Sequence, residues 1–159
     1  MPNRNYRETL DVATSEVLET MFFAVVLGEL PDPASASAEG SGEPPMVVSR
    51  LDFLGQPSGD FYVALSEPAA RSIAGNFLGV EDASELTPVS VGEVVCELAN
   101  ILCGAVLSRV DSLANFKLCH PGLIRSMDLL SLEAATAGAT YDLGDGKLSV
   151  RLRFAAHES

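Results

Sequence analysis

Four small or polar residues of the segment 88–110 fall on one narrow stripe of a helix. The stripe consists of Glu93, Glu97, Asn100 and Gly104. At about 100° per residue, these positions span only about 60° of the helix surface. The Glu97 carboxylate can pair with a lysine of a partner molecule, and the Asn100 carboxamide offers both a donor and an acceptor, which is what holding a water molecule requires. Gly104 has no side chain and permits close approach. These residue types indicate a docking surface that can position a water molecule.

The stripe has to be carried by a helix whose other side is buried. The remaining arc of 88–110 is apolar and consists of Val91, Val94, Val95, Leu98, Ile101, Leu102 and Ala105. We therefore expect this helix to pack on a core and to turn the stripe outward. Spacing alone also fits an ordinary solvated helix face, because Glu-x-x-Asn is a weak pattern. A glycine inside a helix costs about 1 kcal/mol relative to alanine, and either close contact with a partner or packing within the fold can explain Gly104.

Hydrophobic periods and turn residues place the other elements. The sequence predicts, in order, helix 6–27, strands 46–54 and 60–65 joined by a turn at 55–59, helix 67–78, the helix 88–110, strand 116–119, and strands 134–143 and 147–155. The apolar side of the first helix is predicted to be Leu10, Ala13, Val17, Leu18, Met21 and Val25. The last two strands form a hairpin around Gly144-Asp-Gly146, a strong turn signal. The segment 123–132 stays unassigned.

This order of elements predicts an α+β fold, with an antiparallel or mixed β-sheet and two long helices packed on it. A long helix begins each half of the chain, so an internal pseudo-repeat is expected. We expect one domain over 1–159, since this length is typical of a single domain. The segment 31–45 is rich in proline, alanine, serine and glycine and is predicted to be a flexible surface loop inside that domain.

Charge limits the classes of partner. The chain has 22 acidic against 10 basic residues, a net charge of −12. Such a surface repels nucleic acid and anionic membranes, so neither partner is expected. A protein partner with a basic pocket fits the charge. The longest apolar run, 21–28, is too short to span a bilayer, which needs about 20 residues.

Cysteines and acidic pairs do not suggest a metal site. Three cysteines, an odd count, favour reduced thiols in the cytoplasm, buried as small hydrophobic residues. Cys96 and Cys103 lie seven apart, which is not a usual zinc spacing. The two histidines, His120 and His157, are interpreted as structural or surface residues. Asp142 and Asp145 lack the further oxygen ligands of a calcium loop, so a hairpin is the better interpretation there.

The motif helix resembles that of a known family. Glu97-Leu-Ala-Asn100-Ile-Leu-Cys-Gly104 is similar to the Glu-x-x-Asn-x-x-x-Gly helix of the CheC/CheX/FliY chemotaxis phosphatases. Other segments agree in order: 51–65 resembles the family's first hairpin, 69–79 its following short helix, and 116–121 the strand and proline after the motif helix. The resemblance spans about 13–154, and only 31–45 looks like an addition. It implies a CheC-like fold.

The resemblance also implies a function. The motif helix would dock onto a phosphorylated receiver domain such as CheY. Glu97 would form a salt bridge to a receiver lysine, and Asn100 would orient a water for in-line attack on the aspartyl phosphate. Glu93 and Gly104 would contact the partner. The magnesium ion would belong to the receiver, with no cofactor in this chain.

One departure separates this chain from the two-site members of the family. CheC-type proteins carry a second motif on the first helix. Superposing Glu19 on Glu97 puts Phe22 at the place of Asn100 and Val26 at that of Gly104. The chain therefore resembles the single-site CheX pattern, which implies a homodimer. The alternatives are a receiver-binding adaptor or flagellar-switch module with the same fold and no catalysis, and a scaffold whose stripe is merely solvated.

Overall fold

A seven-stranded antiparallel sheet forms the frame of the molecule. The computed structural model describes residues 6–30, 46–55, 58–110, 116–124 and 137–154. The strands are β1 (Gly28–Leu30), β2 (Met46–Leu54), β3 (Gly59–Ser66), β4 (Lys117–Leu118), β5 (Gly122–Ile124), β6 (Ala137–Asp142) and β7 (Lys147–Phe154). Their order is β1-β6-β7-β3-β2-β4, and β5 also pairs with β2. Every pairing among them is antiparallel.

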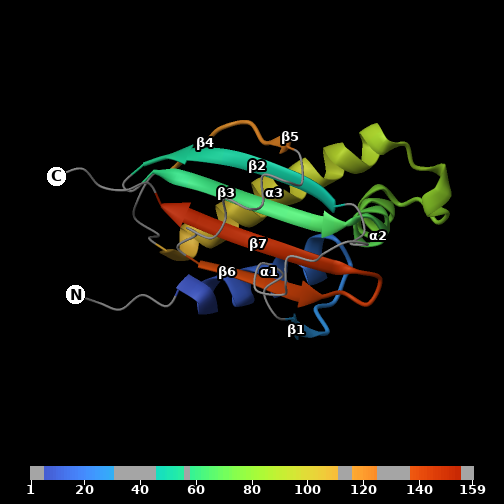
Figure 1. Ribbon diagram of the computed structural model, residues 1–159, viewed down its shortest axis with the longest axis horizontal. Coiled ribbons are helices and arrows are strands. Elements are labelled where there is room, and N and C mark those ends of the chain that lie inside the picture. The colour runs from blue at the N-terminus through green and yellow to red at the C-terminus, as the bar shows by residue number, and fades with distance from the viewer. Residues whose placement is uncertain (1–5, 31–45, 56–57, 111–115, 125–136, 155–159) are drawn as a thin grey trace, which may run out of the picture.

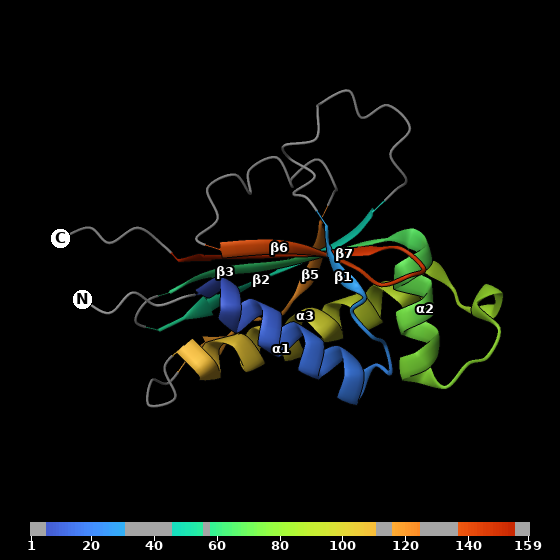
Figure 2. The same ribbon diagram turned by 90° about the horizontal axis from the view of Figure 1, so that it is seen from below.

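The helices lie on one face of this sheet. Helices α1 (Tyr6–Met21) and α3 (Pro88–Val110) cover the face turned away from the viewer in Figure 1, and Figure 2 shows both below the sheet. Helix α2 (Glu67–Leu78) stands at one end, and a short 3₁₀ helix, η2 (Ala83–Glu85), connects it toward α3. The α+β fold with two long helices on an antiparallel sheet is therefore confirmed.

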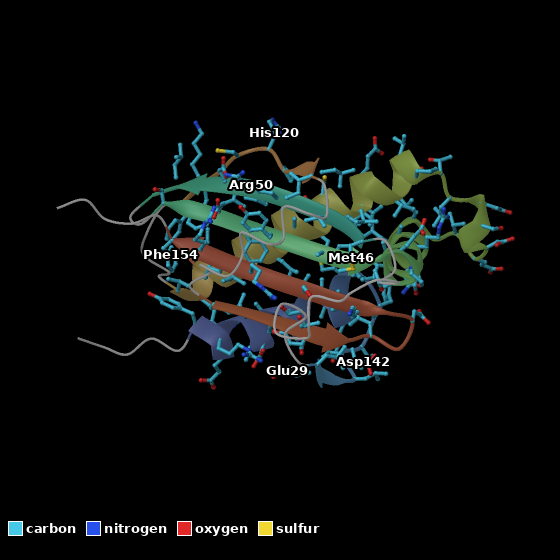
Figure 3. The ribbon with its side chains drawn as sticks, viewed as in Figure 1. Glu29, Met46, Arg50, His120, Asp142 and Phe154 are labelled. Carbon is cyan, nitrogen blue, oxygen red and sulfur yellow. The ribbon has the colours of Figure 1, made fainter. Side chains whose placement is uncertain are left out.

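Side chains along the central strands point alternately to the two faces of the sheet. On β3, Phe61, Val63 and Leu65 are fully buried toward the helices. Burying each such side chain contributes about 1.5–3 kcal/mol. Asp60 and Tyr62 alternate with them and face the opposite side, where Asp60 receives hydrogen bonds from Arg153 on β7. Figure 3 labels Arg50 of β2, which also reaches Asp60 on that side.

The first helix ends six residues earlier than predicted, at Met21. Phe22 turns into the core and stacks on Phe77 of α2, with ring centroids 4.9 Å apart. Phe23 then takes a left-handed backbone conformation, φ 53°. The chain runs on to β1, which pairs with β6 and was not predicted. As a result, the expectation that Met21 and Val25 face the core is wrong, because both are exposed.

The remaining predicted elements agree closely with the structure. Helix α2 has the predicted bounds and ends at Gly79, whose φ of 74° is readily adopted by glycine. The β6–β7 hairpin closes with a 2.9 Å hydrogen bond from the amide of Leu143 to the carbonyl of Gly146. Strand β4 is shorter than predicted, and β5 falls partly in the stretch left unassigned. The predicted loop 31–45 and most of 123–132 lie outside the described residues.

By length and mean hydropathy alone, helix α3 is long and apolar enough to cross a membrane. Half of its most apolar window is buried inside the fold. It contacts β2, β3, α1 and α2. Since the core helix of a globular domain has the same length and composition, its hydrophobicity is explained by this packing.

Candidate functional site

Packing on the sheet orients α3 and so decides which side chains are presented. The buried residues of the helix are Val91, Gly92, Val94, Val95, Leu98, Ala99, Leu102, Cys103, Val106, Leu107 and Val110. Ile101 and Ala105, predicted to face the core, lie at its margin and are half-buried. Glu93 and Glu97 are exposed, and Asn100 and Gly104 are half-buried. The structure thus turns the predicted stripe away from the core.

The polar groups of the stripe are not engaged by other described residues. Among the described residues, the side chains of Glu93, Glu97 and Asn100 have no hydrogen bond or ion pair. Glu97 and Asn100 lie three apart on a regular helix, so their side chains emerge together on one face. A carboxylate and a carboxamide held side by side in this way can each bind a group of a docking molecule, at no cost in internal hydrogen bonds.

The two glycines of α3 differ in how much space a side chain would have at their positions. A Cβ on Gly92 would lie 2.6 Å from Leu123 Cδ1, so this glycine lets β5 pack against the helix. A Cβ on Gly104 would meet only Leu118 Cδ2, at 4.0 Å, which is ordinary contact. Packing within the described fold therefore accounts for Gly92, whose role sequence reasoning missed, and leaves Gly104 without such a reason.

Contacts on both flanks hold α3 in place. Thr87 Oγ1 accepts a hydrogen bond from the amide of Ser90, 3.0 Å, which caps the first turn. Ser49 of β2 donates to Cys96 Sγ at 3.5 Å, one residue from Glu97. Near the other end, Arg109 forms an ion pair with Glu16 of α1. The stripe is therefore presented on an element fixed at its start, its middle and its end.

The corresponding place on α1 differs from the stripe on α3. Glu19 is exposed, but Phe22 is fully buried and lies beyond the helix end. Val26 lies in the irregular segment before β1 rather than one turn further along a helix. The predicted departure from a two-motif arrangement is therefore seen in the backbone as well as in the residue types.

The cysteines and the acidic residues of the β6–β7 turn have different surroundings in the described chain. Cys103 is buried, and burial raises the pKa of its thiol to about 12. Cys96 is half-buried and Cys119 is exposed, so burial of all three cysteines is not what the structure shows. Asp142 Oδ1 accepts a hydrogen bond from the Gly144 amide, as a hairpin requires. Within the described ranges, no three metal-ligating side chains gather.

Comparison with known proteins finds one family and one fold. The family model "Chemotaxis phosphatase CheX" matches residues 47–143. Solved structures similar to this one include chemotaxis protein CheX from Vibrio vulnificus, with a TM-score of 0.71 and 15% identity over 98% of this chain and 99% of that chain. The CheX–CheY–BeF₃–Mg²⁺ complex from Borrelia burgdorferi gives 0.69 and 18%, over 97% and 100%.

A chemotaxis protein CheX from Desulfovibrio desulfuricans gives a TM-score of 0.68 and 13% identity, over 96% of this chain and 100% of that chain. None of the curated proteins compared with the sequence matches it. At these sequence identities, the structural similarity shows only that the fold is shared. The family model matches more than half of the chain, and this match shows the family of the chain.

Proposed function

The chain belongs to the CheX family of chemotaxis phosphatases, and from this premise we propose that it dephosphorylates the aspartyl phosphate of a CheY-like receiver domain. The observation that carries the proposal is the Glu97–Asn100 pair. Both side chains project from one face of α3, whose opposite face is buried in the core. Neither side chain forms a hydrogen bond or an ion pair with another described residue. A structural neighbour is a complex of CheX with CheY, which supports a receiver as the partner.

In the proposed complex, α3 docks along its stripe onto the phosphorylated receiver. Glu97 forms a salt bridge to a lysine in the receiver's active site, which fixes the register of the helix. Asn100 enters that site and hydrogen-bonds the attacking water. Glu93 extends the contact on the exposed side of the helix, and the bare backbone at Gly104 lets the partner approach closely. The magnesium ion is supplied by the receiver.

Phosphoryl transfer suits such a site, because it depends on positioning and electrostatics more than on covalent participation by the protein. A neutral amide aligns water without adding negative charge beside an anionic phosphate. By analogy with loss of one preorganised donor, removing the Asn100 carboxamide lowers the rate about 10²–10³-fold. The exposed Glu97 contributes mainly to docking, so its loss raises KM more than it lowers kcat.

We also propose that the protein is a cytoplasmic homodimer, as the single-motif pattern implies. The partner copy is not required to complete the stripe, since all four of its residues come from one α3. Each protomer would therefore act on its own receiver. Sedimentation of the native protein tests the proposed dimer, because it measures the oligomeric state.

The test is loss of phosphate from phosphorylated receiver domains of the same cell, with native protein, Asn100→Ala and Glu97→Ala. Glu85→Ala is the matched control, because it removes one exposed carboxylate from η2, outside the stripe. We expect Asn100→Ala to bind but not accelerate decay, Glu97→Ala to bind weakly, and the control to act as the native protein does.

Two results would redirect the proposal. Receiver binding by the native protein with no faster phosphate loss would assign the chain to the non-catalytic adaptors. If no receiver binds, or if Asn100→Ala retains full activity, the stripe is not the catalytic surface.

A further inference from the structure

A second surface exposes apolar side chains where α1 ends. We call it the α1-end patch, and it consists of Met21, Phe23, Val25 and Leu27. Their exposed fractions are 43%, 71%, 56% and 64%, respectively. Single exposed hydrophobic residues are ordinary, but several gathered at one place mark an interaction surface or a liability, and Phe23, Val25 and Leu27 line one groove. None of these residues belongs to the stripe on α3.

The α1-end patch borders a groove rather than a flat surface. The groove has a volume of about 210 Å³ and lies between the patch, α2 and the β6–β7 turn. Its apolar and polar lining includes Phe23, Val25, Leu27, Ile73, Asn76 and Leu143. Figure 2 shows the end of α1 beside α2 at the same end of the molecule. A groove of this size accepts one or two large apolar side chains of a partner.

The backbone at the patch is held in a costly conformation. Phe23 is the one non-glycine residue of the described chain with positive φ, at 53°. Its carbonyl accepts a 3.3 Å hydrogen bond from Asn76 Nδ2 of α2. A left-handed conformation at such a residue costs about 1–3 kcal/mol and persists where the surroundings impose it. Here the strain turns an aromatic ring outward while Phe22 fills the core.

Acidic residues outnumber basic ones around the groove. Asp145 lines it and Glu19 stands on the last turn of α1, and neither has an ion pair among the described residues. Glu29, by contrast, is paired with Arg7. Asp142, labelled in Figure 3, ends β6 beside the β6–β7 turn, and Lys147 lies opposite it at the start of β7 as a nearby cation. With a net charge of −12 on the whole chain, the groove repels an anionic membrane and attracts a cationic segment.

We propose that the α1-end patch is a docking site for an amphipathic helix of a partner protein, with apolar side chains for the groove and lysine or arginine beside them. Helix-in-groove recognition uses this combination of an apolar face and flanking charge. The apolar side chains of the partner supply the affinity, and the basic ones select it over neutral or acidic helices. The surface is distinct from the receiver-binding stripe, so the two partners can bind at once.

The test uses a synthetic helix of leucine and lysine, about 18 residues or five turns long. Two peptides of equal length are compared with it, one of leucine and glutamate and one of serine and lysine. We expect the leucine–lysine peptide to bind the native protein at least about tenfold more tightly than either. Phe23→Asn should weaken that binding about tenfold or more, because it removes the anchor ring.

The variant is chosen so that unfolding cannot explain a loss of binding. Asparagine tolerates the left-handed conformation better than phenylalanine, so Phe23→Asn should melt at the native temperature or higher. Val12→Ser, which changes an exposed apolar residue of α1 outside the patch, should leave binding unchanged. Receiver dephosphorylation should be native in both variants, which separates this site from the stripe.

Three outcomes overturn the inference. Equal binding of the serine–lysine peptide would mean that charge alone is recognised. Native affinity in Phe23→Asn would remove the patch from the contact. A dimer that Phe23→Asn converts to monomer would assign the patch to a second copy of this chain.

Discussion

Replacing Gly104 by alanine should raise stability and lower activity together. The added Cβ would have Leu118 Cδ2 as its nearest neighbour, 4.0 Å away, so nothing in the described fold has to move. The helix gains the propensity difference between glycine and alanine, about 1 kcal/mol. For a domain of this size, that gain raises Tm by about 2–4 °C. Urea and thermal denaturation of the variant measure it.

The same methyl group should obstruct the proposed docking. It would lie on the stripe, where the receiver is proposed to approach the bare backbone beside Asn100. Overpacking of a tight contact costs about 1–3 kcal/mol, which corresponds to a roughly five- to 150-fold weaker complex. We therefore expect KM for the phosphorylated receiver to rise by a factor in this range, with a smaller change in kcat.

The control is Gly92→Ala, on the same helix but off the stripe. It gains the same propensity, but its Cβ must displace Leu123, 2.6 Å away, so its net stabilisation is smaller. Its activity should be native. If Gly104→Ala gained stability and kept native KM, close approach along the stripe would be refuted. A loss of stability in Gly104→Ala would instead refute the view that this position is open.

Three further predictions concern stability. Phe22→Ala should lose about 3–5 kcal/mol in urea denaturation, because it empties a fully buried site; a normal stability would contradict the packing described. Cys103 keeps its neutral thiol when folded, since burial raises the pKa from 9.0 to about 12. The unfolding free energy should therefore fall by up to about 1.4 kcal/mol per pH unit as the pH rises from 9.0 to about 12, and Cys103→Ala should flatten this slope; an unchanged slope would contradict it. Asp60→Asn should cost about 1.5–3 kcal/mol by thermal denaturation, because Asp60 accepts charge-assisted hydrogen bonds from Arg153 at 2.7 and 3.0 Å; a native Tm would show that this pair contributes nothing.

Local sequence patterns were sufficient to predict those elements whose own residues carry a clear helix period, turn motif or helix-end residue. The period of α3 placed Glu97 and Asn100 on one face, since helix geometry is the same wherever the helix lies. Turn chemistry was sufficient for the β6–β7 hairpin at Gly144, and helix-end signals for α2, which stops at Gly79. The roles of the stripe residues came from a family resemblance rather than from spacing, and they remain predictions.

Long-range contacts decided the rest. The periodicity of the first helix continues past Met21, but the buried stack of Phe22 on Phe77 and the pairing of β1 with β6 end it there. Strands of two or three residues, such as β4 and β5, have too little sequence to signal themselves, because their partners stabilise them. Likewise, the sequence showed two glycines in one helix, and only the packed sheet revealed that a Cβ on Gly92 would clash with Leu123 whereas one on Gly104 would make only ordinary contact with Leu118. A residue's neighbours in the chain determine its local geometry, but which atoms oppose it depends on how distant segments pack.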